Sequence, residues 1–271
     1  MPDPKPDPSD ISLTEEDTMP APAARRKSRA SSATGRKGAS KKAAPARPSA
    51  LKRLRRWLLR AVFGVIGFFL LLVLLFSFIP PVTNIYQIQE SWRLGGIKRD
   101  WVSWEEIAPV MGRSAVAAED ANFCNHWGFD MAAIRDAINS GSNRGASTIS
   151  QQVAKNVFLW QGRSWLRKAM EASLTPVIEL VWSKQRILEV YLNIAEFDEG
   201  VFGVQAAAKH YFKVDARKLS QLQAARLAAI LPDPKGRSAS NPSTFVKSRT
   251  RAIISGADTI KADGRARCFE G

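Results

Sequence analysis

The stretch SWEEIAPVMGRSAVAAEDANFCNHWGFD, residues 103–130, decides the fold class of this chain. Ser103 is followed three residues later by Glu106, the pattern of a capping box at a helix start. The small apolar residues 115–118 can then bury one side of a helix. The stretch therefore predicts helical packing, and its second half gathers the side chains that could carry chemistry.

Two adjacent carboxylates, Glu119 and Asp120, stand where the apolar run ends, and His126, one of two histidines in the chain, follows. A carboxylate at the border of a buried segment can have its pKa raised toward neutral pH, which suits a general base. Paired acids near a helix end are also common as solvated or capping groups. The rest of the chain has to decide between these interpretations.

Further helices are predicted on both sides of this stretch. Ser220 and Gln223 repeat the capping pattern, and residues 165–182 and 184–193 show helical spacing, with a kink expected at Pro176. Strand-like alternation is hard to find, and the sequence has no internal repeat. The predicted fold class is all-α, or mainly α.

A run of nineteen residues without a charge, Ala61 to Ile79, points to a membrane helix. As a helix it spans roughly 28 Å, about the hydrocarbon thickness of a bilayer. It is too long and too far from the N-terminus for a cleaved signal peptide. We predict a disordered basic cytoplasmic tail, a single transmembrane helix, a connector and one folded domain, at residues 1–56, 57–80, 81–100 and 101–271 respectively.

Charge around this run sets the expected orientation. Residues 1–60 hold 15 of the 40 Lys and Arg, whereas residues 80–92 hold none. By the positive-inside rule the N-terminus is cytoplasmic and the domain lies outside. The basic tail is explained by orientation and by attraction to anionic membrane lipids, so no nucleic-acid partner is expected.

The chain has two cysteines, Cys124 and Cys268. They are too few for a disulfide framework and lack the spacing of metal ligands. A single bridge between them stays open, but two unpaired thiols are the favoured expectation.

Residues 145–156, GASTISQQVAKN, predict a second helix with a functional face. Ser147 or Thr148 can cap it, Thr148 together with Gln151 as a second choice of capping box. Thr148, Gln152 and Lys155 share one side of the helix. An open helix N-terminus beside a hydroxyl, an amide and an ammonium suits an anion such as a phosphate. An ordinary capped surface helix is the competing interpretation.

Arg167 and Lys168 precede Glu171 by four and three residues, so the three share a helix face. They form either a plain ion-pair group or a carboxylate that holds two cations beside a phosphate site.

These residues fall into five ordered motifs that resemble the peptidoglycan glycosyltransferases, glycosyltransferase family 51, over about residues 100–250. The motifs contain Glu119, Asp120, Phe123, His126, Gly128 and Asp130; Gly145, Ser147, Thr148, Gln151, Gln152, Lys155 and Asn156; Arg167, Lys168 and Glu171; Lys184, Ile187, Glu189, Tyr191, Leu192 and Asn193; and Arg226, Pro232 and Pro234. The chain leaves no room for the transpeptidase domain of class A penicillin-binding proteins, so it resembles the monofunctional form. The resemblance implies a lysozyme-like, two-lobed glycosyltransferase domain behind the transmembrane helix.

The resemblance also implies substrates and roles. The growing lipid-linked glycan is the donor, and the 4-hydroxyl of lipid II is the acceptor. Glu119 is the expected catalytic base, and Glu171 the catalytic carboxylate on the donor side. The expected substrate-binding residues are Asp120, Phe123, His126, Arg144, Thr148, Gln152, Lys155, Arg167 and Lys168. Asn122 departs from the family, where this position is commonly basic, and Arg144 is a candidate replacement; Pro176 has no functional explanation.

No tightly bound cofactor and no metal site are expected, although a divalent cation, Mg²⁺ or Mn²⁺, is compatible with the donor pyrophosphate. Expected partners are lipid II, lipid-linked glycan and membrane lipids, with cell-wall synthesis and division proteins as candidates. The expected location is the cell inner membrane, single-pass, with the catalytic domain periplasmic. A lysozyme-like hydrolase that cleaves glycan and a non-catalytic membrane scaffold remain the alternatives.

Overall fold

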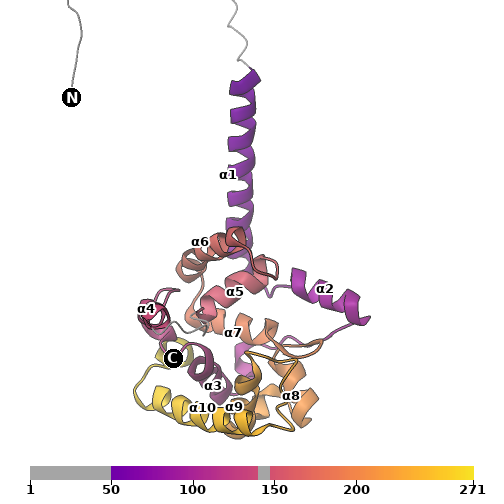
Figure 1. Cartoon of the computed structure of the whole chain (residues 1–271), viewed down its shortest axis with the longest axis vertical. Coiled ribbons are helices and arrows are strands. Elements are labelled where there is room, and N and C mark those ends of the chain that lie inside the picture. The colour runs from indigo at the N-terminus through magenta and orange to yellow at the C-terminus, as the bar shows by residue number, and fades with distance from the viewer. Residues whose placement is uncertain (1–49, 140–146) are drawn as a thin grey trace, which may run out of the picture. The chain divides into compact units, whose positions relative to one another are not determined.

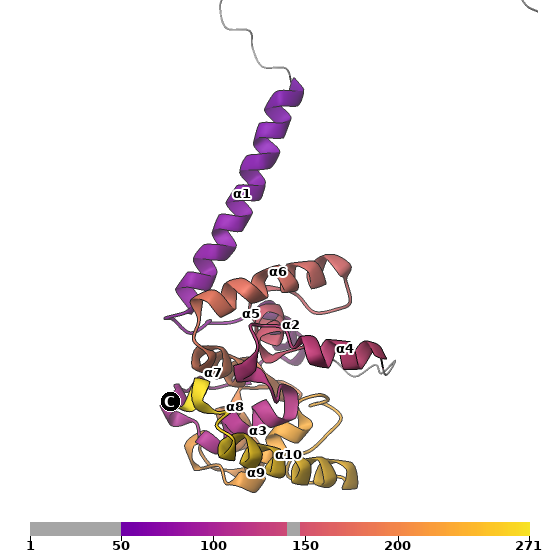
Figure 2. The ribbon, with the colours of Figure 1, turned by 90° about the vertical axis from the view of Figure 1, so that its left-hand side faces the viewer.

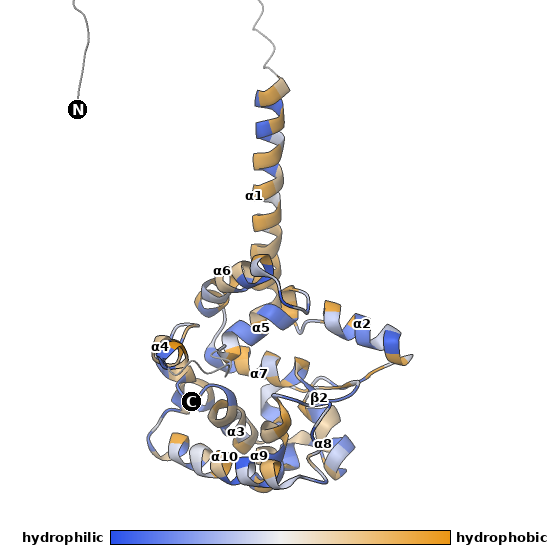
Figure 3. Ribbon diagram, in the orientation of Figure 1, coloured by the Kyte–Doolittle hydropathy of each residue, from blue (hydrophilic) through white to orange (hydrophobic). Residues whose placement is uncertain are grey.

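A long apolar helix opens the part of the chain that the computed structural model describes, residues 50–139 and 147–271. This helix, α1 (Ala50–Phe76), exposes large apolar side chains such as Phe63 and Leu71, which are 69% and 62% exposed. In Figure 3 it is hydrophobic along most of its length, with hydrophilic residues near its N-terminal end. Such a surface is stable in lipid rather than in water. Within the described residues α1 is the one helix long and apolar enough to cross a membrane, and it fits a single-pass anchor, as predicted. Most of the predicted tail, residues 1–49, lies outside the described part.

The remaining elements are mostly helices, as Figure 1 shows. In chain order they are α2 (Ile85–Leu94), β1 (Lys98–Arg99), the 3₁₀ turn η1 (Trp104–Glu106), α3 (Pro109–Glu119), the 3₁₀ turn η2 (Phe123–Asn125), α4 (Met131–Asn139), α5 (Ile149–Phe158), α6 (Trp165–Val181), α7 (Lys184–Ile194), β2 (Glu196–Asp198), β3 (Val201–Phe202), α8 (Val204–Phe212), the 3₁₀ turn η3 (Ala216–Lys218), α9 (Gln221–Ile230), α10 (Thr244–Ala262) and α11 (Arg267–Glu270).

The three strands form one small sheet in the order β1-β3-β2, with β1 parallel and β2 antiparallel to β3. Each strand is two or three residues long, too short to show alternation in the sequence. The prediction of a mainly α fold is confirmed.

Capping signals in the sequence mark several helix starts. Thr148 caps α5 and Ser220 caps α9, each with the expected reciprocal hydrogen bonds to Gln151 and Gln223. The pair Ser103 and Glu106 starts the 3₁₀ turn η1, and α3 begins after it. Helix α6 continues through Pro176 as one helix.

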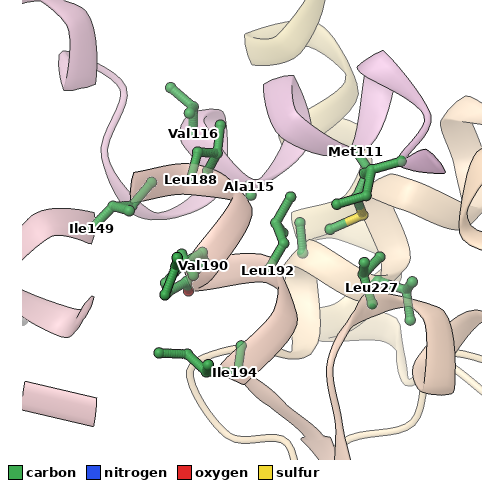
Figure 4. Packing of buried hydrophobic residues seen from close by; sticks show 14 of the residues in the cluster. Met111, Ala115, Val116, Ile149, Leu188, Val190, Leu192, Ile194 and Leu227 are labelled. Atoms are coloured by element: carbon green, nitrogen blue, oxygen red, sulfur yellow. The ribbon is translucent and has the colours of Figure 1, made fainter. Parts of the chain in front are cut away.

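Helix α7 lies at the centre of the core. From Ile187 to Ile194 all but one of its residues are buried, which is the pattern of a helix covered on every side. Figure 4 shows side chains of α7 next to Ala115 and Val116 of α3, Ile149 of α5 and Leu227 of α9. This packing fixes the end of α3 and the start of α5 relative to one another.

The helices pack in two groups around α7. Helices α3, α9 and α10 pack on one another, and so do α5 and α6. Helix α6 also packs against the C-terminal part of α1, as Figures 1 and 2 show. The indole Nε1 of Trp182 donates to the carbonyl oxygen of Val73 at 2.7 Å, and Nη2 of Arg186 donates to that of Phe76 at 3.0 Å. The carbonyls at the end of α1 therefore find partners in the domain that follows.

Candidate active site

Glu119 is the last residue of α3, and its side chain is 14% exposed. The amide Nε2 of Gln152 donates to its Oε2 at 3.1 Å, and Nη2 of Arg249 lies 3.7 Å from its Oε1. Burial raises the pKa of the Glu119 carboxyl, while the Gln152 hydrogen bond and the charge of Arg249 act against the rise. Glu119 is therefore a partly buried carboxylate with a raised pKa, which suits a general base.

Asp120, next in the chain, uses both carboxylate oxygens inside the protein. Oδ2 accepts the backbone N–H of Ile149 at 3.0 Å, and Oδ1 lies 2.8 Å from Nε2 of His126. Asp120 thus occupies the N-terminus of α5, where a negative charge is favoured. The expectation of an open helix N-terminus is wrong: the anion at this position is a side chain of the protein itself.

Phe123 and His126, the other predicted site residues in the loop after α3, are in contact with side chains of the protein interior. Phe123 is fully buried, with its ring 6.3 Å from that of His126. Nζ of Lys184 lies 4.4 Å above the Phe123 ring and donates to the carbonyl of His126 at 2.8 Å. The ammonium also pairs with Glu179 at 2.8 Å. Lys184 therefore ties the loop to α6 and α7, and its pairing with Glu179 was not predicted from the sequence.

Thr148 is also buried, and its hydroxyl donates to the carbonyl of Gly128 at 2.7 Å. Gly128 has a φ of 83°, and a Cβ there would lie 2.5 Å from the Thr175 methyl, so this close approach requires glycine. Both predicted residues are therefore engaged within the protein: Thr148 holds the backbone at Gly128, and His126 contacts the Asp120 carboxylate.

A pocket of about 220 Å³ opens beside Glu119. It is lined by Glu119, Asp120, Ala121, Asn122, Asp130, Ala133, Ser147 and Thr148. The amide of Asn122 donates to Asp130 at 3.0 Å, so the side chain at this unusual position is engaged within the loop. We call this the acid side of the site.

A second pocket, of about 360 Å³, is lined by Arg163, Ser164, Trp165, Arg167 and Lys168 at the start of α6. We call it the cationic side. Glu171 is 3% exposed here, and it accepts from Nη1 of Arg167 at 2.8 Å and from Nζ of Lys168. The predicted shared face of these three residues is confirmed, and the carboxylate fixes the positions of both cations.

Lys168 and Lys155 connect the acid side with the cationic side. Nζ of Lys168 lies 3.4 Å from Oγ of Ser147, which lines the acid side. Lys155 follows Gln152 by one turn of α5, and the charges of Glu171, Arg167 and Lys168 act on it. Burial, together with the two neighbouring cations, lowers the pKa of Lys155, while Glu171 raises it.

Arg249 is a residue of the site that was not predicted from the sequence. Arg249, on α10, contacts Glu119 from 130 residues away in the chain, and Nη2 also donates to the carbonyl of Ala118 at 3.2 Å. Helical spacing alone did not separate it from other basic residues of its segment. Arg144 lies outside the described residues, so its predicted role stays a prediction.

The two cysteines are joined in a disulfide, with 5.6 Å between the Cα atoms of Cys124 and Cys268. The favoured expectation of two free thiols is therefore wrong. The fold brings η2 and α11 together although they are 144 residues apart, a contact that spacing in the sequence cannot show.

The chain is similar to known proteins over most of its length. The family model described as Transglycosylase matches residues 87–258. The chain is 59% identical over 216 residues to the biosynthetic peptidoglycan transglycosylase of Jannaschia sp. (strain CCS1), covering 80% of this chain and 90% of that protein. It is 50% identical over 219 residues to the protein of that name from Cronobacter sakazakii (strain ATCC BAA-894), covering 77% and 91%. For Pseudomonas putida (strain W619) the identity is 51% over 209 residues, covering 73% and 89%. The chain belongs to the transglycosylase family.

Proposed function

We propose that this transglycosylase polymerises peptidoglycan glycan strands from lipid II. The growing lipid-linked glycan is the donor, and the 4-hydroxyl of an incoming lipid II attacks it. The observation that carries this proposal is the pairing of a partly buried carboxylate with a raised pKa, Glu119, with a group of cations held by Glu171. The names of the relatives, all peptidoglycan transglycosylases, support the substrate class.

On the acid side, Glu119 takes the proton of the acceptor hydroxyl. The acceptor oxygen then forms a bond to the anomeric carbon of the donor, and the bond from that carbon to the pyrophosphate breaks with inversion. The raised pKa supports this role because a stronger base accepts the hydroxyl proton more readily in the transition state.

On the cationic side, the electron pair of the broken bond passes to the undecaprenyl pyrophosphate. This leaving group needs compensation of its charge more than it needs a proton. Arg167 and Lys168 are fixed by Glu171, so they can stabilise the growing charge without reorganising. Lys155, whose ammonium is partly desolvated, adds a third cation.

A divalent cation is compatible with this scheme as a ligand of the substrate pyrophosphate. Among the residues of the described ranges, no group of three His, Cys, Asp or Glu side chains is placed to hold a metal ion. The Glu171 oxygens already accept from two cations. Within the described residues the Glu171 carboxylate is therefore engaged by Arg167 and Lys168, and the proposed steps use side chains.

We further propose that the protein is anchored in the inner membrane by α1, with its domain in the periplasm. The disulfide supports this placement, since such bonds persist in oxidising compartments and are rare in the cytosol. The polyprenyl chain of the substrate would then lie in the membrane that holds the enzyme. Cell-wall synthesis and division proteins remain candidate partners.

The test is incubation of the full-length protein, in detergent, with labelled lipid II. Polymeric glycan and undecaprenyl pyrophosphate are expected from the wild type, and polymer formation at least about 10²-fold slower from Glu119→Gln. Finished glycan strands serve as the second substrate. Release of soluble disaccharides from those strands, without polymer from lipid II, would show a hydrolase and overturn the proposal.

A further inference from the structure

The loop after Glu119, residues 120–126, is bound by a C-terminal segment, residues 263–271. The disulfide between Cys124 and Cys268 joins them covalently. The guanidinium Nη1 of Arg265 also donates to the carbonyl oxygen of Ala121 at 2.9 Å. The loop that begins one residue after the proposed base is therefore held at two points from the end of the chain.

The C-terminal segment is itself firmly anchored. Phe269 is buried, and its ring lies 6.1 Å from that of Trp104 and 6.4 Å from that of Phe123. The carboxylate of Glu270 pairs with Nη1 of Arg113, on α3, at 2.6 Å. The disulfide thus connects the loop to a segment that is packed against the core and against the helix that carries Glu119.

Movement of the loop would change the contacts that Glu119 makes. Asp120 is the first residue of the loop, and its carboxylate bonds to the start of α5, the helix that presents Gln152 to Glu119. If the loop shifts, the bond from Asp120 to Ile149 and the position of Gln152 shift with it. Both cysteines of the chain are used at this one place.

The segment lies beyond the part of the chain that the family model matches, which ends at residue 258. The contacts of the loop with α5, α6 and α7 come from residues within the matched part, whereas Arg265 and Cys268 come from outside it. The C-terminal half of this attachment therefore lies outside the matched part, although Cys124 lies within it.

We propose that residues 263–271 form a disulfide-locked clamp that holds the loop 120–126 in the conformation in which Glu119 acts. Cys124, Cys268 and Arg265 are positioning residues: they act through the loop and touch no substrate. This inference rests on the proposed function for its kinetic consequence, but its structural consequence can be measured independently.

Release of the clamp has a predictable effect on Glu119. A loosened loop admits water, which reduces the burial that raises the Glu119 pKa. The groups that act on this carboxyl are Asp120 beside it, Gln152 on α5, Arg249 on α10, and Arg237, and the Tyr191 hydroxyl of α7 interacts with it. Burial is the largest of the influences on this pKa, so its loss outweighs the displacement of Gln152, and the pKa falls toward its ordinary value. The acid limb of the pH–rate profile then moves to lower pH.

The test uses the full-length protein in detergent and the double variant Cys124→Ser/Cys268→Ser. In the wild type, alkylation without reductant should leave both cysteines unmodified, and with reductant it should modify both. Hydrogen exchange at the amides of residues 119–126 should be faster in the double variant. With lipid II the variant should lose about 10-fold or more in kcat, with a smaller change in KM, because misplacement of a catalytic group costs rate.

A matched control separates positioning from general stability. Phe197→Leu, in the buried core at β2, lowers Tm without touching the loop, and it should leave the acid limb of the pH–rate profile in place. Both variants are assayed well below their own Tm. Each single Cys→Ser variant should match the double, since either one removes the same bond.

Alkylation of both wild-type cysteines without reductant would overturn the clamp. So would unchanged exchange at residues 119–126 in the double variant, or unchanged kcat and acid limb. Failure of the wild type to polymerise lipid II would instead overturn the proposed function, while the exchange measurement would still decide whether the clamp exists.

Discussion

Two glutamates, the partly buried Glu119 and the buried Glu171, occupy opposite sides of the site in different surroundings. Glu119 meets a neutral amide at 3.1 Å and a guanidinium at 3.7 Å, and burial raises its pKa. Glu171 accepts directly from Arg167 and Lys168. The same side chain is suited to accept a proton in one place and to fix cations in the other, so the partners and not the residue type determine its role.

The two sides also differ in how they are built. The cationic side is made by residues three and four apart on α6, whose positions follow from helix geometry. The acid side joins α3, α5, α10 and the C-terminal segment through contacts that are distant in the sequence. Substitutions should therefore act on the two sides in different ways.

The largest effect is expected from Glu119→Gln. The amide keeps the shape of the side chain but cannot accept the acceptor proton, so kcat should fall by about 10²–10⁴-fold with KM little changed. Steady-state polymerisation of lipid II measures both constants. A variant with more than a tenth of the wild-type kcat would remove Glu119 from the role of base.

A smaller loss, about 10²-fold in kcat, is expected from Glu171→Gln, because the variant loses the charged acceptor that positions Arg167 and Lys168. The acid limb of the pH–rate profile should stay where it is, since Glu119 is untouched. Glu171→Asp, which keeps the charge on a shorter side chain, is the matched control and should recover part of the rate. A shift of the acid limb in Glu171→Gln would show that the two sides are not separate.

The smallest effect is expected from Arg249→Gln. The charge of Arg249 lowers the Glu119 pKa, so its removal should raise that pKa further and move the acid limb to higher pH. At a pH below the limb the rate should drop by about 2- to 5-fold, as expected for a partly exposed ion pair, and high salt should reduce the difference from wild type. A shift of the limb to lower pH would contradict the assigned interaction.

Local patterns in the sequence predicted the parts of this protein that depend on neighbours along the chain. The caps at Thr148 and Ser220, and the shared face of Arg167, Lys168 and Glu171, are set by helix spacing. The apolar run within α1 was also predicted from the sequence, because a helix that crosses lipid needs an unbroken apolar surface.

Contacts between distant segments could not be predicted in the same way. The disulfide of Cys124 with Cys268 depends on packing of the chain end against η2. The use of Asp120 to close the N-terminus of α5, and the approach of Arg249 to Glu119, depend on how α3, α5 and α10 meet. Such contacts follow from the tertiary fold and leave no periodic signal.

The most direct test of the central claim is the pH dependence of kcat/KM for lipid II polymerisation. In the wild type the acid limb should report the ionisation of Glu119, with an apparent pKa above the ordinary range of a glutamate side chain, about 4.3 in model peptides. The same limb should be absent from the residual activity of Glu119→Gln. An identical limb in wild type and Glu119→Gln would contradict the assignment of Glu119 as the base.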